Sequence, residues 1–202
     1  MAAVGECSLD LYNTTLVSSD QLSIDHQSTD GYGYFTAPPD VVSNVTPSKT
    51  VVGQGYSMFI NVTVENQGPY TETFNVTVYA NTTIIETKTN ITLTSGSSTA
   101  LTIPWNTTGI AEGNYTITAH ITPLPETDTT DNSLTGGTVV VTIPGDVNGD
   151  HKVDLKDVFA VALAYGSYPG HPMWNPNLDI NGDQKVDLKD YFAAVLNYGE
   201  SW

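Results

Sequence analysis

Two copies of one acidic segment near the C-terminus contain the residues whose types and spacing could do chemistry. Residues 146–166 and 179–199 align with an offset of 33, and 15 of the 21 aligned positions are identical. Each copy contains a loop with oxygen-bearing side chains at its positions 1, 3, 5, 9 and 12. These side chains are Asp146, Asn148, Asp150, Asp154 and Asp157 in the first loop, and Asp179, Asn181, Asp183, Asp187 and Asp190 in the second.

This spacing is typical of a loop that binds Ca2+. Calcium takes about six to eight oxygen ligands, and a chain that curls around the ion presents alternate side chains to it. The residue at position 7 binds through its backbone carbonyl, so Lys152 and Lys185 complete the two predicted ligand sets. Each loop carries four carboxylates, which repel one another unless a cation lies between them. We therefore expect two bound Ca2+ ions, and poorly ordered loops without them.

An amphipathic helix is predicted after each loop. Apolar residues line one face of each helix: Leu155, Val158, Phe159, Ala162 and Leu163 in the first, and Leu188, Phe192, Val195 and Leu196 in the second. Gly166 and Gly199 are expected to end the two helices. We expect the duplicated unit to be antiparallel, which would bring its ends together and place Trp202 near Ile143 or Pro144.

A loop followed by a helix, twice, without the incoming helix of an EF-hand, resembles a type I dockerin over residues 145–202. The resemblance implies that the module binds a cohesin-like protein partner. Two departures stand out. His151 and Gln184 replace the usual glycine at position 6, so each is expected to adopt a positive φ. Leu-Lys pairs at 155–156 and 188–189 replace the small hydroxyl residues common in cellulosomal dockerins, which suggests a receptor other than a cellulosomal cohesin.

Residues 38–144 have the pattern of half-buried antiparallel strands. Apolar and polar side chains alternate in short runs, and turn residues such as those at 66–68, 95–96 and 112–114 separate the runs. The apolar positions are Met58, Ile60, Val62, Val64, Phe74, Val76, Val78, Ile91, Leu93, Leu101, Ile103, Tyr115, Ile117, Ala119, Val139, Val141 and Ile143. About seven short strands in roughly a hundred residues indicate an immunoglobulin-like β-sandwich.

Four stretches of this region carry a family resemblance. They are VTPS at 45–48, NVTVENQG at 61–68, GNYTI at 113–117 and ETDTTDN at 126–132. Together they resemble a CARDB domain, from an adhesion-related, immunoglobulin-like family of prokaryotic surface proteins. The resemblance implies a spacer or adhesion role. We therefore predict a mainly β chain, with an N-terminal arm (1–37), a CARDB-type β-sandwich (38–144) and a small α-helical dockerin-like module with two calcium loops (145–202).

The composition narrows the function classes. The chain has 22 acidic residues, 6 lysines and no arginine, and its formal net charge is −16, so nucleic acid and anionic membranes are not expected partners. No apolar run is long enough to span a membrane. Eight asparagines stand in N-x-T, which favours a secreted or cell-surface protein with possible N-linked glycans: Asn13, Asn44, Asn61, Asn75, Asn81, Asn90, Asn106 and Asn114. No serine, histidine and acid set has a recognisable motif around it, so we expect no enzymatic activity.

The N-terminal arm keeps two other functions open. Leu9, Leu11, Thr15 and Val17 alternate like a strand that a neighbouring copy could accept at a sheet edge. In that alternative the chain is a self-assembling subunit of a surface filament or tube. A carbohydrate-binding module is the minor alternative; clustered exposed aromatic residues would favour it, and the densest aromatic group in the sequence lies in the arm, at residues 32–35.

Overall fold

The structure is a computed structural model that describes residues 28–29, 32–33, 40–122 and 132–202. The strand-like part of the predicted arm, residues 9–17, lies outside these ranges. The strands are β1 (Ser28–Thr29), β2 (Tyr32–Gly33), β3 (Asp40–Pro47), β4 (Val51–Gly53), β5 (Ser57–Asn66), β6 (Glu72–Ala80), β7 (Thr83–Leu93), β8 (Ser98–Asn106), β9 (Gly113–Thr122) and β10 (Ser133–Thr142). The helices are α1 (Leu155–Leu163), the short 3-10 helix η1 (Pro176–Leu178) and α2 (Leu188–Leu196).

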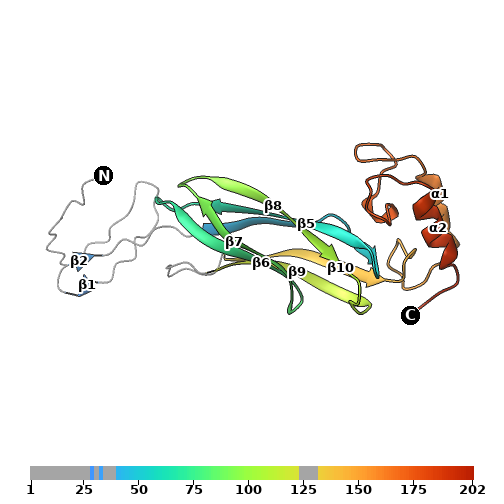
Figure 1. Cartoon of the computed structure of the whole chain (residues 1–202), viewed down its shortest axis with the longest axis horizontal. Helices are drawn as coiled ribbons and strands as arrows, with labels where there is room; N and C mark the ends of the chain where they lie inside the picture. The colour runs from blue at the N-terminus through green and yellow to red at the C-terminus, as the bar shows by residue number, and fades with distance from the viewer. Residues whose placement is uncertain (1–27, 30–31, 34–39, 123–131) are drawn as a thin grey trace, which may run out of the picture.

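Two sheets pack face to face to form the β-sandwich (Figure 1). One sheet has five strands in the order β4-β10-β9-β6-β7, and the other has three in the order β3-β5-β8. Neighbouring strands are antiparallel except β4, which pairs in parallel with β10. In the described part of the chain, β7 and β8 each have a neighbour on one side only, so one edge of each strand is free.

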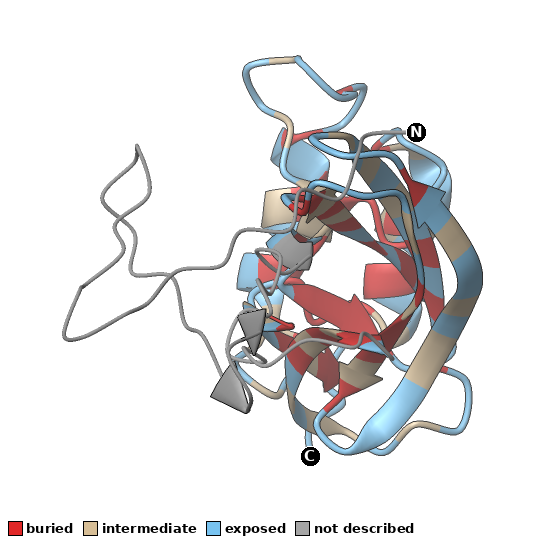
Figure 2. Cartoon of the chain, turned by 90° about the vertical axis from the view of Figure 1, so that its left-hand side faces the viewer, coloured by how far each residue is buried: buried red, intermediate tan, exposed pale blue. Residues whose placement is uncertain are grey.

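The predicted alternation of apolar residues forms the core of the sandwich. Figure 2 shows the buried residues gathered between the two sheets. Met58, Ile60, Val62 and Val64 on β5 all point into this core, as do their counterparts on β6, β9 and β10. Ile91 on β7 and Leu101 on β8 are only partly buried, since both strands lie at sheet edges. The mainly β, immunoglobulin-like class is therefore confirmed.

The strand count differs from the prediction. The structure describes eight strands between residues 40 and 142, whereas the alternation predicted about seven. The six alternating runs named from the sequence correspond to β5–β10, and the two strands without such a run are β3 and the three-residue β4. All three residues of β4 are buried, so this segment has no polar and apolar alternation to reveal it.

The two predicted helices form a compact unit beyond the end of the sandwich at which β10 finishes (Figure 1). Backbone hydrogen bonds connect each loop to the segment that follows the helix of the other repeat. Val153 of the first loop donates to Glu200 O and accepts from Gly199 N, and Val186 of the second loop exchanges the same bonds with residues 166 and 167. This crosswise pairing makes the unit antiparallel and brings its ends together, as predicted.

The helical unit packs tightly against the sandwich. Tyr56 contacts both the core of the sandwich and the small core of the helical unit. Gly145 has a φ of +104°, and a Cβ atom there would lie 2.8 Å from Ala194 Cα. Glycine is therefore required where the chain leaves the last strand and meets α2.

Candidate functional site

The first acidic loop brings three of its predicted ligands together. Asp146, Asp150 and Asp157 each offer a carboxylate oxygen, and these oxygens all lie within 4.8 Å of one another. They come from loop positions 1, 5 and 12, so residues that are far apart in the loop converge on one point. Oxygen-only ligands of this kind suit a hard cation such as Ca2+.

Backbone N–H groups fix the orientation of the two buried carboxylates in the first loop. Asp146 Oδ1 accepts from Gly149 N at 2.7 Å, and its Oδ2 accepts from His151 N at 2.9 Å. Asp157 accepts from the N–H groups of residues 147 and 154 at 3.1 and 2.9 Å. The chain thus wraps around its own carboxylates, with the side chains oriented by the loop backbone.

The second loop repeats this hydrogen-bond pattern. Asp179 accepts from the N–H groups of Gly182, Asp183 and Gln184 at 2.8, 3.1 and 2.9 Å. Asp190 accepts from the N–H groups of residues 181 and 187 at 3.1 and 2.8 Å. Two separate loops therefore adopt the same local fold, as their near-identical sequences predicted.

The two loops differ in how closely their carboxylates converge. Among the described residues, only the first loop has three acidic side chains within the 4.8 Å spacing. In the second loop, Lys189 Nζ lies 2.9 Å from Asp183 Oδ2, whereas in the first loop Lys156 Nζ lies 3.6 Å from the equivalent Asp150 Oδ2. The second loop thus has a closer lysine partner on its position-5 carboxylate.

The predicted ligands at positions 3 and 9 have local roles in both loops. Asn148 and Asn181 each accept a bond from the N–H of the position-5 residue at 2.8 Å. Asp154 and Asp187 are the N-caps of α1 and α2, and each forms a capping box with the carboxylate at position 12. A position-9 side chain commonly reaches calcium through a water molecule, so this capping role is compatible with a bound ion.

The position-6 residues adopt the backbone conformation predicted for them. His151 has a φ of 71° and Gln184 has a φ of 66°. Lys152 and Lys185, at position 7, follow directly after these turns. Lys152 Nζ lies 3.3 Å from Asp154 Oδ2 at the surface.

Burial and contacts move the carboxyl pKa values in opposite directions. Burial raises the pKa of Asp157, against the effect of the backbone N–H groups that bond to it. Burial also raises the pKa of Asp179, against the effects of the Lys49 charge and of its backbone N–H partners. The exposed Asp154 and Asp183 have lowered pKa values, chiefly because Asp154 accepts from the Lys156 N–H and Asp183 from the Lys189 ammonium. A raised pKa means that these favourable contacts do not fully offset the cost of burying the negative charge, and a bound cation would offset more of it.

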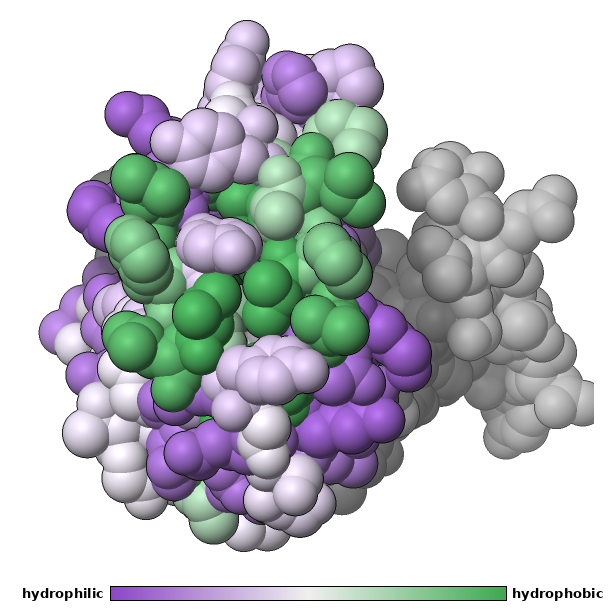
Figure 3. Space-filling view, turned by 90° about the vertical axis from the view of Figure 1, so that its right-hand side faces the viewer, coloured by the Kyte–Doolittle hydropathy of each residue, from purple (hydrophilic) through white to green (hydrophobic). Residues whose placement is uncertain are grey.

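The apolar faces of the two helices point outward. The most exposed large side chains on α1 are Leu155, Phe159 and Leu163, and those on α2 are Leu188, Phe192 and Leu196. Leu163 is 73% and Leu196 is 80% exposed. Figure 3 shows apolar side chains gathered on the end of the molecule that carries these helices. We call these six residues the apolar helix face. The helices α1 and α2 contribute only valine and alanine side chains to the buried core of the module, Val161, Ala193 and Ala194, and the segments outside these two helices supply its larger members, such as Leu178 and Ile180.

Several exposed aromatic residues also lie in this module, and their exposure was not predicted from the sequence. Tyr165, Tyr168, Tyr198 and Trp202 are each roughly half exposed. Tyr165 and Tyr198 are equivalent positions of the repeat, so the offset of 33 was the signal that could have found them. The densest aromatic group in the sequence, at residues 32–35 of the arm, lies outside the residues whose side chains the structure describes.

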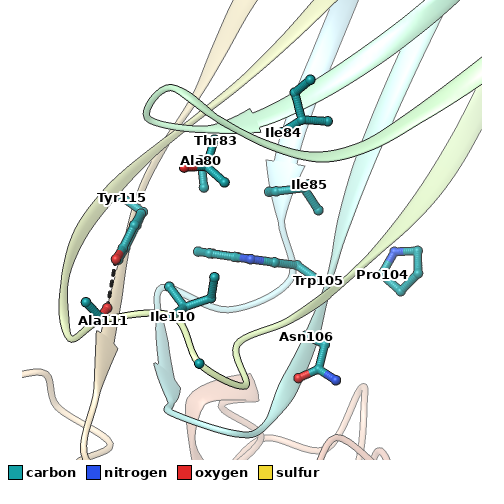
Figure 4. A pocket seen from close by; sticks show the side chains of 11 residues that line it. Ala80, Thr83, Ile84, Ile85, Pro104, Trp105, Asn106, Ile110, Ala111 and Tyr115 are labelled. Carbon is teal, nitrogen blue, oxygen red and sulfur yellow. Dashed lines mark hydrogen bonds between the residues drawn. The ribbon is translucent and has the colours of Figure 1, made fainter.

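A cavity of about 460 Å³ opens between the two sheets near the free edges of β7 and β8. Its lining includes Ile85, Trp105, Ile110 and Tyr115 (Figure 4). Tyr115 donates its hydroxyl hydrogen bond to Ala111 O at 2.8 Å. Asn106 and Thr83 are among the few polar side chains of the lining, which contains no carboxylate, lysine or histidine. Tyr115 is the one ionisable side chain in this lining, and its hydroxyl is bonded to the backbone.

Comparison with known proteins assigns the sandwich to a family. Residues 38–136 match the sequence model of the CARDB family. This segment is therefore a CARDB domain, as its motifs predicted. The match ends before the acidic repeat, so the dockerin resemblance of residues 145–202 stays a prediction. A search of curated proteins finds no match.

Two solved structures illustrate the likeness. The chain is similar to the CARDB domain of the PF1109 protein from Pyrococcus furiosus, in complex with di-metal ions, with 27% identity and a TM-score of 0.47 over 55% of this chain and 98% of that one. It is also similar to a domain (272–376) of a "putative cell surface protein" from Methanosarcina acetivorans, with 29% identity and a TM-score of 0.42 over 52% of this chain and 92% of that one. No helix in the described residues is long and apolar enough to cross a membrane.

Proposed function

We propose that this chain is a non-enzymatic, calcium-binding extracellular protein whose module at residues 145–202 is dockerin-like and binds a protein partner. The observation that carries this proposal is the apolar helix face. Six large apolar side chains are exposed on two short helices, and each helix begins at the end of one acidic loop. Monomeric proteins rarely leave such a contiguous apolar surface in water unless it binds something.

Calcium would act here as a structural ion. The side chains that would hold it are Asp146, Asn148, Asp150, Asp154 and Asp157 in the first loop and their five counterparts in the second, with the carbonyls of Lys152 and Lys185. The fit rests on the donor chemistry and on the two buried carboxylates whose pKa values burial raises. Because position 12 lies in the first turn of each helix, cation binding would fix the helix relative to its loop. The metal would thereby fix the position of both halves of the apolar helix face.

The partner is proposed to be a cohesin-like receptor. The residues at loop positions 10 and 11 support a receptor that reads apolar and basic groups, since Leu155 and Leu188 belong to the apolar helix face and the lysines that follow them are exposed. The sandwich is proposed to be a spacer or adhesion domain on the cell surface or in the medium. Seven of the eight N-x-T asparagines lie in the described residues; Asn75 is half-buried and the other six are exposed, so glycans could be attached without unfolding the sandwich.

A calcium titration by isothermal calorimetry tests the metal part of the proposal. The wild-type chain is expected to bind two ions. Asp157→Asn and Asp190→Asn are matched variants, since each replaces the buried position-12 carboxylate of one loop, and each is expected to bind one ion fewer. A chain that releases or absorbs no heat with Ca2+ would contradict this part of the proposal.

Site-specific photo-crosslinking tests the partner-binding part. A crosslinking residue at position 196, on the apolar helix face, is expected to capture one protein only in the presence of Ca2+. The same residue at position 84 on the sandwich, where Ile84 is also exposed, is the control. Binding reconstituted with the purified partner should be lost in Phe159→Ser and Phe192→Ser. Equal capture from positions 196 and 84 would contradict a docking role for the helix face.

A second candidate function is self-assembly through strand donation. The free edges of β7 and β8 support it, because unpaired backbone groups on an edge strand can accept an added strand. The opening between the sheets at these edges exposes apolar side chains that an inserted strand could cover. A carbohydrate-binding role is the minor alternative, and the exposed tyrosines of the module support it.

A further inference from the structure

One lysine of the sandwich reaches into the second acidic loop. Lys49 lies between β3 and β4, and only 6% of its surface is exposed. Its ammonium donates a hydrogen bond to the backbone carbonyl of Asp179 and a longer one, of 3.4 Å, to the carbonyl of Ile180. The structure describes all six lysines of the chain, and Lys49 is the buried one.

The residues next to Lys49 anchor the same contact. Asn177 Oδ1 accepts from the N–H groups of Thr50 and Val51 at 3.0 and 3.3 Å, and Asn177 Nδ2 donates to Thr50 Oγ1 at 2.9 Å. Asn177 precedes Asp179 by two residues. A continuous stretch of the sandwich, residues 49–51, is therefore docked on the start of the second loop.

The Lys49 ammonium bonds directly to backbone carbonyls of the second loop, and two buried carboxylates of that loop act on it electrostatically without forming an ion pair. Burial lowers the pKa of Lys49, and the negative charges of Asp179 and Asp190 oppose that effect. These are the side chains at positions 1 and 12, the two that the loop backbone surrounds with N–H groups. Burial deprives the ammonium of water, so the carbonyl bonds and the nearby negative charges are what stabilise its charged form.

In the first loop, the sandwich contributes a neutral group that bonds to the position-1 carboxylate itself. Asp146, the counterpart of Asp179, accepts a hydrogen bond from Thr142 Oγ1 at 2.6 Å. The lysines near the first loop, Lys152 and Lys156, contact its exposed carboxylates instead. Two loops with the same ligand types thus meet the sandwich through different chemistry.

We propose that Lys49 is a resident cation of the second loop, so that this loop stays ordered against the sandwich without a bound metal, whereas the first loop depends on one. The ammonium supplies part of the positive charge that a metal supplies in the first loop. The order of the metal-free second loop does not depend on the proposed function. Only the consequence that Ca2+ changes the first loop more than the second rests on the proposed function.

Amide hydrogen exchange on the metal-free chain tests this inference. The probes are the amides that bond to the position-1 carboxylate: those of residues 182–184 in the second loop and of residues 149–151 in the first. The second set is expected to exchange at least about tenfold more slowly than the first. Lys49→Met should remove this difference, and Lys49→Arg, which keeps the charge, should retain it. Equal exchange in the two wild-type loops would overturn the proposal.

Two control variants distinguish the effect of the Lys49 charge from the effect of packing between the sandwich and the second loop. Lys88→Met removes a lysine that pairs with Glu86 on the sandwich, and it should leave the difference between the loops unchanged. Asn177→Ala removes the neighbouring neutral contacts and should preserve most of it. If Asn177→Ala abolishes the difference as completely as Lys49→Met, packing alone explains it and the proposal is overturned. Slow exchange at Val76 and Val78 in the core verifies that each variant is folded.

Adding Ca2+ to the same samples distinguishes this inference from the proposed function. Calcium should slow exchange in the first loop more than in the second. A chain whose exchange does not respond to Ca2+ would contradict the proposed metal binding, while the difference measured without metal would still decide the role of Lys49.

Discussion

The indole Nε1 of Trp202 donates a hydrogen bond of 3.0 Å to Thr142 Oγ1. Thr142 is the last residue of β10 and is fully buried, and its hydroxyl donates in turn to Asp146 Oδ2. The final residue of the chain is thereby connected to the sandwich and to the first carboxylate of the first loop. Trp202 also packs its ring against His151, with ring centroids 4.3 Å apart. The ends of the module therefore meet as predicted, and the hydrogen-bonded residue is Thr142, one position before Ile143.

Removing this hydrogen bond should weaken the joint between the sandwich and the module. Trp202→Phe keeps an aromatic ring but has no N–H, so we expect the free energy of unfolding of the module to fall by about 1 kcal/mol. Chemical denaturation followed by circular dichroism measures it. A double-mutant cycle with Thr142→Val isolates the pair, and strictly additive effects of the two substitutions would show that the bond contributes nothing.

Chelation should loosen the module and leave the sandwich folded. Without a cation the buried carboxylates of the first loop repel one another, so α1 is expected to lose order first. We expect the helical circular dichroism signal to fall when metal is removed and to return with Ca2+. The core of the sandwich shares few residues with that of the module, so its β signal should persist. An unchanged helical signal in chelator would mean that the loops do not need a metal.

The pH dependence of stability should change sign between the metal-free and calcium-bound chain. Burial raises the pKa of Asp157 and of Asp179 above the ordinary value of about 3.9, so the folded metal-free module binds protons more tightly than the unfolded chain. Its Tm should therefore rise as pH falls from neutrality toward those raised values. With saturating Ca2+ the Tm should fall over the same range, because protons compete with the metal.

Asp157→Asn is the matched variant for this pH effect. The amide resembles the protonated carboxyl, so the metal-free variant should be more stable than wild type at pH 7 and less sensitive to pH. The lowered pKa values of Asp154 and Asp183 act in the opposite direction, but both groups are exposed and contribute little. A metal-free Tm that falls steadily with acid would contradict the assigned effect of burial.

Deleting residues 1–20 should distinguish strand donation from receptor binding. If the arm is donated to a neighbour, the truncated chain should fold and bind two Ca2+ ions but no longer self-associate, as measured by light scattering with calcium. Leu9→Asp together with Leu11→Asp is a milder version that keeps the chain length. Unchanged assembly after truncation would exclude strand donation and leave the helix face as the interaction surface.

Most local features could be predicted from the sequence. The two loops with their N-caps, the helices after them and the strands of the core all follow from spacing within ten or so residues, because loop geometry and the periodicity of helices and strands are short-range properties. The positive φ of His151 and Gln184 is a case in point: position in the loop alone predicted it. β4 was not predicted, because its three residues are all buried and so show no alternation of apolar and polar side chains.

The sequence by itself therefore determined the class of fold, the duplicated acidic loops and the apolar pattern of each helix. Only the tertiary structure decided that this apolar pattern faces water, because the helices turn the opposite face, with Val161, Ala193 and Ala194, into the core that the two helix–loop units share. It also decided that Lys49, 130 residues before Asp179, partners the second loop and that Thr142 partners the first. Such pairings depend on how two separately encoded units dock, and no short-range pattern in the chain records that geometry.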